Sequence, residues 1–365
     1  MFNAKSGNSQ RYPLTNISFK KKIKYIAAVA ALSGIFLTAC GEEDTSYVEN
    51  GMNAISALDY DTALDAFSQA EEAEEDERLI LRGRGMALMA KLEYEEAVDC
   101  FTRALQLSNG VPQDIDYDIN YYLAAAYYKS GQLDEAKSVY DAILTLRSNE
   151  TDAYYLRGII NIEQGDYESA NADFKKAMSL KNDDFDMVID IYQIMAAAGY
   201  KDAGRELISE CISSHSDISD YNMGRFEYYL GNYDSARNYL ENSDKGDSGQ
   251  TTLYLGRTYE ALGDYNYAIS LYNTYLDKNH DDSNIYNQMG LCQMKMERYS
   301  EALSSFQAGM NVEDSSITQT LKFNEIVAYE YMNEFRQAAL LMKDYIKMYP
   351  DDKAALREYE FLKTR

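Results

Sequence analysis

The stretch Gly256–Tyr272, which reads GRTYEALGDYNYAISLY, contains the pattern that decides the fold of this 365-residue chain. Gly256 is followed three residues later by Tyr259, and Tyr265 is followed by Ala268 and then by Tyr272. The alanine of this pattern returns nine times at intervals of 32 to 39 residues, as Ala63, Ala97, Ala136, Ala170, Ala203, Ala236, Ala268, Ala302 and Ala338. A spacing near 34 residues predicts an array of helix-turn-helix units.

A second recurring position lies twelve residues before each alanine and is small in seven of nine cases. Its occupants are Gly51, Gly85, Ala124, Gly158, Ile191, Gly224, Gly256, Gly290 and Ile326. Small residues on one helix allow close approach of the second helix of the same unit. Between the two positions, glycines such as Gly131, Gly165, Gly231 and Gly263 are placed to adopt the left-handed conformation that ends a helix.

This combination, Gly-x2-Tyr followed by Tyr-x2-Ala-x3-Phe, resembles the tetratricopeptide repeat over roughly residues 44–350. The resemblance implies an all-α, right-handed α-solenoid of about nine repeats, and we expect one elongated array. A C-terminal capping helix is expected within residues 351–365, where Leu356, Tyr359 and Leu362 would cover the last hydrophobic face. Ile191 and Ile326 depart from the family's small position.

The first 39 residues follow the pattern of an export signal. Four lysines between Lys20 and Lys24 precede the apolar segment Ile26–Thr38, which is too short to span a bilayer. The segment Leu37-Thr38-Ala39-Cys40 resembles the bacterial lipoprotein signal. This resemblance implies that residues 1–39 are removed and that Cys40 is acylated with chains such as palmitate. Residues 40–43 would then form a lipidated tether. The alternative is a short buried helix that ends in an ordinary cysteine.

The lipoprotein signal also predicts where the chain resides. We expect it on the extracytoplasmic face of a bacterial membrane, which is the cell membrane in a single-membrane species and the outer membrane otherwise. Residues 1–39 hold six of the 35 basic side chains and none of the 60 acidic ones, so residues 40–365 carry a net charge of −31. This charge repels nucleic acid, and we expect no nucleic-acid partner.

The sequence contains no constellation that points to catalysis. The two histidines, His215 and His280, occupy the same loop position two repeats apart and cannot share a metal ion. The acidic run Glu71–Glu77 lacks the alternation of a calcium loop and is interpreted as a solvated helix end. Cys100, Cys211 and Cys292 are at least 81 residues apart and are predicted to be buried thiols. We therefore predict a non-enzyme with no metal, cofactor or catalytic residue.

A partner-binding groove is the main functional prediction. In the family that the chain resembles, the first helix of each repeat lines a concave surface. Projecting that face onto this sequence gives Arg82, Tyr121, Tyr128, Tyr155, Tyr192, Tyr221, Arg225, Tyr228 and Arg257. Tyrosine and arginine dominate the energetics of protein interfaces. Arg225 and Arg257 are equivalent positions of adjacent repeats, and either they receive a carboxylate from a partner or they pair with neighbouring acids.

Two functions are consistent with these features. The first is a membrane-anchored, non-catalytic scaffold for protein–protein interaction, which binds a segment of another exported or membrane protein in the groove. The alternative is a glycan-binding or assembly accessory of cell-envelope or exopolysaccharide biogenesis, because tyrosine rings also stack on sugars. The sequence does not distinguish between them.

Overall fold

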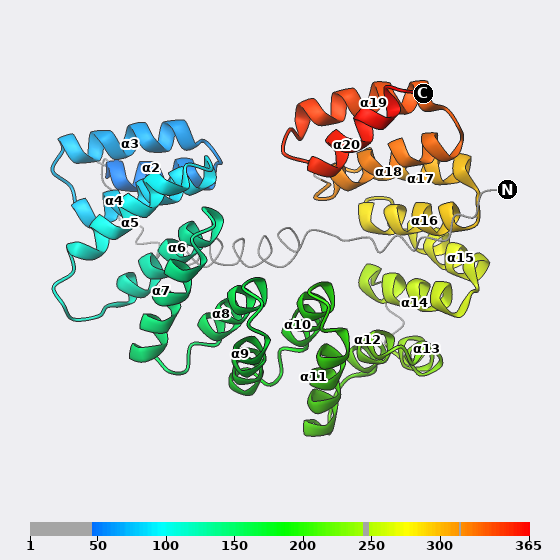
Figure 1. Ribbon diagram of the computed structural model, residues 1–365, viewed down its shortest axis with the longest axis horizontal. Helices are drawn as coiled ribbons and strands as arrows, with labels where there is room; N and C mark the ends of the chain where they lie inside the picture. Colours follow the sequence, from blue (N-terminus) through cyan, green and yellow to red (C-terminus); the bar gives the residue numbers. More distant parts are fainter. Residues whose placement is uncertain (1–45, 244–247, 314) are drawn as a thin grey trace, which may run out of the picture. The chain divides into compact units, whose positions relative to one another are not determined.

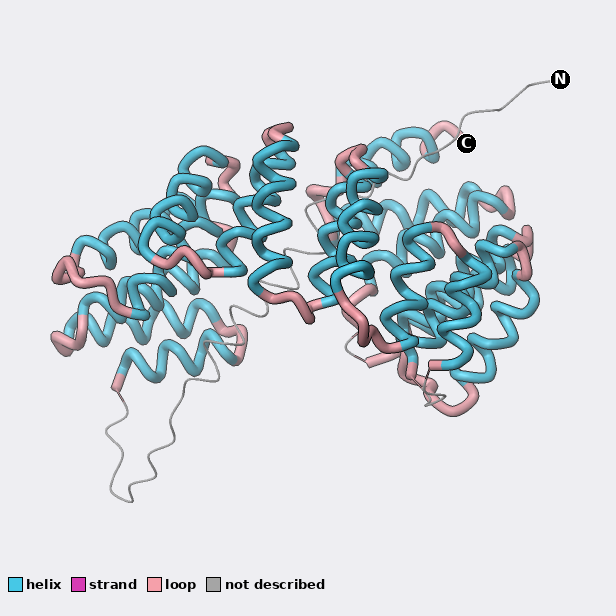
Figure 2. Tube along the Cα trace, turned by 90° about the horizontal axis from the view of Figure 1, so that it is seen from below, coloured by secondary structure: helices cyan, strands magenta, loops and turns pink. Residues whose placement is uncertain are grey.

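A computed structural model describes residues 46–243, 248–313 and 315–365, and every regular element in these ranges is an α-helix (Figures 1 and 2). The all-α prediction is confirmed. The predicted signal peptide and Cys40 lie outside the described residues. Within the described ranges, the helices are all too short or too polar to cross a membrane.

The chain divides into two compact units, one that ends at Cys211 and one that begins at Ile212. The first unit contains the helix pairs α2 (Tyr47–Ser56) and α3 (Tyr60–Glu72), α4 (Glu77–Ala90) and α5 (Tyr94–Gln106), α6 (Asp114–Lys129) and α7 (Leu133–Leu146), α8 (Thr151–Glu163) and α9 (Tyr167–Leu180), and α10 (Phe185–Ala197) and α11 (Lys201–Ser214). The last three residues of α11 pass the boundary between the units.

The second unit continues the same plan. Its helices are α12 (Asp220–Leu230) and α13 (Tyr233–Asn242), α14 (Gly249–Leu262) and α15 (Tyr265–Leu276), α16 (Ser283–Lys295) and α17 (Tyr299–Met310), α18 (Thr318–Tyr331) and α19 (Phe335–Met348), and the final α20 (Lys353–Leu362). Both units follow the predicted helix-turn-helix plan, and the division between them falls within α11. Because each repeat packs only on its neighbours, an array can form more than one such unit.

Each repeat is closed by contact between its small position and a large residue sixteen positions later. A Cβ atom placed on Gly158 of α8 would lie 2.6 Å from Cε1 of Phe174 on α9, and one on Gly256 would lie 2.3 Å from Tyr272. Both rings are fully buried. The prediction of close helix approach is confirmed, and the glycine is required because an aromatic ring occupies the space of a side chain.

The two isoleucines that depart from the small position have a matching change on the second helix. Ile191 belongs to the same buried cluster as Leu207, and Ile326 belongs to the same cluster as Met342. All four side chains have at most 1% of their surface exposed. Leucine or methionine in place of an aromatic ring makes room for the isoleucine, so each of these repeats still closes on a buried apolar contact.

The turn between the two helices of each repeat has one residue with a positive φ angle. It is Gly131, Gly165, Gly199, Gly231 or Gly263 in the five central repeats, which confirms the predicted role of the glycines. In the other four repeats it is Leu58, Leu92, Glu297 or Asn333, with φ of 60–66°. A leucine in this conformation is strained, because its Cβ approaches the following carbonyl oxygen.

The capping helix α20 is present, and its buried face differs from the prediction at one residue. Ala355 and Leu362 are buried against α18 and α19, and Tyr359 packs partly against them. Leu356, which was predicted to cover the core, is 40% exposed. The prediction is therefore right for Tyr359 and Leu362 and wrong for Leu356, whose place on the buried face is taken by Ala355.

Candidate functional site

All nine predicted groove residues lie on first helices, as expected. Five belong to the first unit, namely Arg82 on α4, Tyr121 and Tyr128 on α6, Tyr155 on α8 and Tyr192 on α10. Four belong to the second unit, namely Tyr221, Arg225 and Tyr228 on α12 and Arg257 on α14. The two groups differ in what surrounds them, and each is therefore described by itself.

Arg82 is engaged in an ion pair between neighbouring repeats. Its Nε donates to Oδ2 of Asp118 on α6 at 2.5 Å, and its guanidinium lies 5.8 Å from the ring centroid of Tyr122. One turn earlier on α4, Arg78 pairs with Asp116. These two pairs join α4 to α6, so Arg82 stabilises the stacking of repeats two and three.

Three of the four predicted tyrosines in the first unit are part of the packing. Tyr155 has no exposed surface and its ring centroid lies 6.2 Å from that of Phe174. Tyr192 and Tyr128 are 6% and 7% exposed, and the Tyr128 hydroxyl donates to Glu163 on α8. A partner cannot contact a covered ring, so the predicted contact roles of these three residues are wrong. The first helices of adjacent repeats pack closely enough to cover a large side chain between them.

Tyr121 is half-buried and lies 6.0 Å from the ring of Tyr140. Burial, followed by the nearby charges of Glu150 and Asp152, raises the pKa of the Tyr121 phenol above its ordinary value. The phenol therefore stays neutral at physiological pH. Tyr121 is the one predicted tyrosine of the first unit that keeps appreciable exposed surface.

The second unit contains an aromatic cluster on α12 and α14. The ring of Tyr254 lies 6.3 Å from that of Tyr221, 6.0 Å from that of Tyr228 and 6.1 Å from that of Tyr229, each in an edge-to-face arrangement. The hydroxyls of Tyr229 and Tyr254 are 3.2 Å apart. Edge-to-face contacts of this kind stabilise beyond area burial alone and hold the rings in fixed orientations.

Arg225 is enclosed by this aromatic cluster. Its guanidinium lies 5.1 Å from the ring centroid of Tyr221 and 5.4 Å from that of Tyr254, which is the geometry of cation–π contacts. Its Nη1 donates to Asn222 Oδ1 at 3.0 Å, and only 7% of the residue is exposed. The predicted direct contact of Arg225 with a partner is therefore wrong, and the residue holds the tyrosines in place.

Arg257 lies beside the same cluster and is half-buried. Its charge opposes the upward shift that burial imposes on the pKa of Tyr228, which shows that the two side chains are close. Its Nε donates to Oε1 of Gln288 at 3.1 Å. Arg257 forms no ion pair with any residue that the structure describes.

The acid nearest to Arg257 along α14 is Glu260, and other donors already satisfy it. Tyr272 Oη donates to Oε1 of Glu260 at 2.8 Å, Gln288 Nε2 donates to the same oxygen at 2.9 Å, and Lys295 Nζ lies 3.0 Å from Oε2. Glu260 is 5% exposed. Because this carboxylate is neutralised by Lys295, the positive charge of Arg257 remains uncompensated beside three half-buried tyrosines, Tyr221, Tyr228 and Tyr229.

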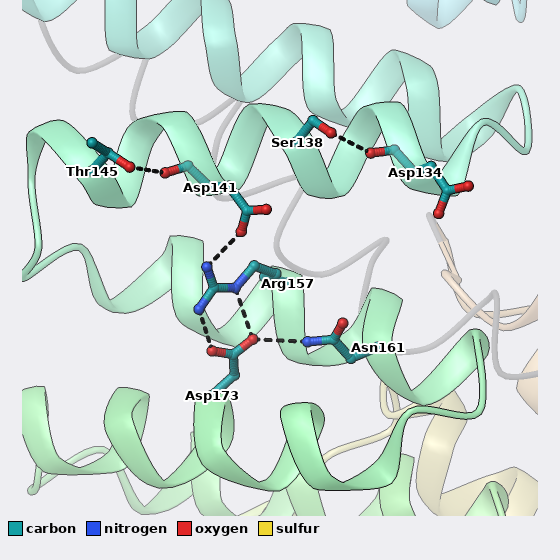
Figure 3. Close-up of polar contacts among 7 residues, drawn as sticks. All are labelled: Asp134, Ser138, Asp141, Thr145, Arg157, Asn161 and Asp173. Carbon is teal, nitrogen blue, oxygen red and sulfur yellow. Dashed lines mark hydrogen bonds and ion pairs between the residues drawn. The ribbon is translucent and has the colours of Figure 1, made fainter.

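The first unit has its own polar cluster around the buried Asp173, and its contacts are explained by packing (Figure 3). Arg157 on α8 bonds Asp173 on α9 and Asp141 on α7, and Asn161 Nδ2 donates to Asp173 Oδ2 at 3.0 Å. The hydrogen bonds to Asp173 raise the pKa of Arg157 above its ordinary value. The cluster contains no nucleophile and joins repeats three and four.

The acidic run and the cysteines have structural roles. Glu75 accepts hydrogen bonds from the Ser46 hydroxyl at 2.6 Å and from the backbone N–H groups of Tyr47 and Val48 at 2.7 and 3.0 Å, so it caps α2. Cys100, Cys211 and Cys292 form no disulfide in the described ranges and are buried, as predicted. Burial raises the pKa of the Cys211 thiol to about 11 and that of Cys292 to about 12, which makes both thiols poor nucleophiles. Within the described ranges, His, Cys, Asp and Glu side chains form no cluster that could hold a metal ion.

Models of the tetratricopeptide repeat match residues 48–112, 88–160, 151–184 and 251–283. The chain belongs to the tetratricopeptide repeat family. The helix pairs outside these matches follow the same spacing of small position, turn and alanine. Tetratricopeptide repeat proteins typically serve as non-catalytic scaffolds that bind protein partners.

Solved structures that resemble this tetratricopeptide repeat protein have low sequence identity to it. One is a tetratricopeptide repeat protein from Parabacteroides merdae, with 16% identity, coverage of 77% of this chain and 97% of that one, and a TM-score of 0.46. Yeast Tom70 has 19% identity, with 89% and 74% coverage and a TM-score of 0.47. MamA from Desulfovibrio magneticus RS-1 has 19% identity, with 49% and 100% coverage and a TM-score of 0.40. No curated protein matches the chain.

The sequence prediction missed Tyr254 and Gln288 of this tetratricopeptide repeat protein. Tyr254 is central to the aromatic cluster but lies two residues before Gly256, a position outside the projected face. Gln288 orients Arg257 from the next repeat, 31 residues away. A search for polar partners about one repeat period apart could have found Gln288, whereas the position of Tyr254 depends on the rotation of α14.

Proposed function

We propose that this protein is a membrane-anchored extracytoplasmic lipoprotein that acts as a non-catalytic scaffold, and that it binds a segment of another exported or membrane protein beside Arg257. The observation that carries the binding site is the uncompensated charge of Arg257 next to the half-buried rings of Tyr221 and Tyr228. Arginine and tyrosine at the edge of a rigid cluster lose little conformational entropy on binding.

The chemistry of this site favours a partner segment that carries a carboxylate. In a chain of net charge −25, an arginine without an acidic partner retains its attraction for a carboxylate, and its planar guanidinium can form two parallel hydrogen bonds. Gln288 fixes Nε at 3.1 Å, which leaves the two terminal nitrogens for the partner. The edge-to-face packing of Tyr228 and Tyr254 covers part of each ring, so fewer faces remain for stacking on sugars.

The binding site is tested by crosslinking on intact cells. A photo-crosslinking amino acid at Tyr228 should capture one dominant protein, which mass spectrometry identifies. Arg257→Gln should reduce the yield of this crosslink at least about tenfold, because a charge-assisted hydrogen bond at an interface contributes about 1.5–3 kcal/mol. Arg237→Gln is the matched control, since Arg237 lies on α13 and pairs with Asp234, and it should leave the yield unchanged.

Two results would contradict the assignment. A crosslink that survives Arg257→Gln places the partner elsewhere on the protein. The absence of any protein crosslink, together with binding to purified envelope or exopolysaccharide glycans, supports the alternative of a glycan-binding accessory. Thermal unfolding of both variants shows whether a crosslink is lost only because the variant does not fold.

The membrane anchor rests on the sequence of residues 20–41 alone. Cys40→Ser should release the protein into the periplasm or the medium, because acylation requires the thiol of this residue. Fractionation of cells into membrane and soluble pools measures the change. A protein that stays in the membrane fraction after this substitution contradicts the lipoprotein hypothesis.

A further inference from the structure

The dipeptide Asn-Gly occurs twice in the chain, and the two copies lie in different backbone conformations. Asn50-Gly51 lies within α2, whereas Asn109-Gly110 lies in the loop between α5 and α6. Both asparagine side chains are exposed to solvent. A difference in reactivity between the two side-chain amides would therefore arise from the backbone and not from access of water.

The backbone nitrogen of Gly110 is accessible to the asparagine side chain that precedes it. Gly110 has a φ angle of 83°, and a Cβ atom placed on it would have no neighbour within 4 Å. Its N–H donates no hydrogen bond in the described structure. Because glycine has no Cβ and adopts a wide range of φ angles, this nitrogen can approach Cγ of Asn109 without a steric barrier.

A hydrogen bond polarises the side-chain amide of Asn109. The backbone N–H of Val111 donates to Asn109 Oδ1 at 3.0 Å. This donor stabilises the negative charge that develops on Oδ1 when a nucleophile adds to Cγ. The same contact folds the side chain back over the peptide bond between residues 109 and 110, which keeps Cγ close to the Gly110 nitrogen.

The helix prevents the same approach at Asn50. Asn50 N donates to Ser46 O at 3.0 Å, and the helical pattern pairs the N–H of Gly51 with the next carbonyl along α2. Gly51 is buried, and a Cβ atom placed on it would lie 2.6 Å from Cε1 of Phe67. Attack on Cγ of Asn50 therefore requires that this turn of α2 opens first.

We propose that Asn109 is a site of spontaneous deamidation. The Gly110 nitrogen loses its proton to solvent base and forms a bond to Cγ of Asn109. The bond between Cγ and Nδ2 breaks, and Nδ2 takes up a proton and leaves as ammonia, so that a succinimide ring joins the two residues. One water molecule then opens the ring at either carbonyl, which gives aspartate or isoaspartate. This inference does not depend on the proposed partner or on the membrane anchor.

The modification changes the connection between repeats two and three. Either product adds a carboxylate to a chain whose net charge is −25. In isoaspartate the main chain passes through Cβ and Cγ of residue 109, so the loop becomes one bond longer. Residues 109–113 are exposed, and we expect α5 and α6 to stay folded after the change.

Peptide mapping of the full-length protein by mass spectrometry tests the proposal. The folded protein is incubated at mildly alkaline pH, and the fraction of each asparagine that has gained the mass of one deamidation is followed with time. We expect Asn109 to react at least about tenfold faster than Asn50, because reaction at Asn50 requires local opening of a helix. In the protein unfolded in urea, the two rates should agree within about threefold.

Gly110→Ala should slow the reaction at Asn109 at least about tenfold, because a Cβ atom hinders the nitrogen and a φ angle of 83° is unfavourable for alanine. Gly263→Ala is the matched control, since it makes the same change at a glycine with φ of 89° in the second unit, and it should leave the rate at Asn109 unchanged. Equal rates at Asn109 and Asn50 in the folded protein would overturn the proposal. An Asn109 that stays unmodified in the folded protein, under conditions that modify it in urea, would overturn it as well.

Discussion

The guanidinium of Arg157 on α8 binds the carboxylate of Asp173 on α9 through two hydrogen bonds, from Nε at 2.9 Å and from Nη2 at 2.6 Å (Figure 3). A third nitrogen, Nη1, reaches Asp141 on α7 at 2.6 Å. One arginine thus joins three helices of repeats three and four. Because Asp173 is buried and Asp141 is exposed, the two acids should contribute unequally to stability.

Asp173→Ala should lower the free energy of unfolding of the first unit by about 3 kcal/mol, since it leaves a partly buried arginine and Asn161 without their acceptor. Asp141→Ala should cost less than about 1 kcal/mol, as expected for an exposed ion pair. Urea denaturation followed by circular dichroism measures both values. Equal effects of the two substitutions would show that the bidentate contact is not the dominant one.

The small position of a repeat and the large residue sixteen positions later should be replaceable only as a pair. A change at one of the two positions alone should not be tolerated. Gly158→Ile alone places a branched side chain against the ring of Phe174, because a Cβ atom on residue 158 would lie 2.6 Å from Cε1 of that ring. This substitution should lower the free energy of unfolding by about 3 kcal/mol. Gly158→Ile combined with Phe174→Leu copies the pair Ile191 and Leu207. We expect the double variant to recover at least about 2 kcal/mol relative to the single isoleucine variant.

The matched control for this cycle is Gly158→Ile combined with Phe101→Leu, which alters the large residue of a different repeat. Its effects should add, because Phe101 packs on Gly85 and not on Gly158. Thermal unfolding of the four variants gives the coupling energy. Equal coupling for the matched and unmatched leucines would refute the pairing.

Replacement of the strained leucines should stabilise the protein. Leu58→Gly and Leu92→Gly each remove a leucine with φ above 60° from an exposed turn, where the side chain contributes little burial. We expect the free energy of unfolding to rise by about 0.5–1 kcal/mol per site, after the higher conformational entropy of glycine in the unfolded chain is included. Leu107→Gly is the control, because Leu107 is also exposed but has φ of −78°, and it should not stabilise. Melting temperatures decide the outcome.

Acid should detach the first helix at Glu75. The Ser46 hydroxyl and the N–H of Val48 are the main causes that lower the pKa of Glu75 below 4.5. The cap is therefore intact above that value and is lost as the pH falls through the lowered pKa. In NMR spectra, the amide resonances of Tyr47 and Val48 should shift over this range in the wild type and not in Glu75→Gln. Glu72→Gln, a change at an exposed neighbour, should leave the titration unchanged, and a wild type without any shift would contradict the cap.

The repeat pattern alone was sufficient to predict the helix pairs, the glycine turns and the close approach at Gly256, because these depend on residues within one repeat. The burial of Tyr155 and Tyr192 was not predictable, since it depends on how far each repeat rotates on the next. The ion pair of Arg82 with Asp118 was not predicted, although the sequence contains a signal for it. Its members are 36 residues apart, near one period, so a search for opposite charges at that spacing would have found it.

The contact between each small position and the ring sixteen residues later also has a consequence for how the chain folds. The tightest packing in each repeat joins residues that are close in sequence, so a repeat can close with little loss of chain entropy. Folding can start at any repeat and spread to its neighbours, and each repeat can begin to close as soon as its own residues leave the ribosome. A chain built in this way can lengthen by duplication of a repeat without a new folding problem.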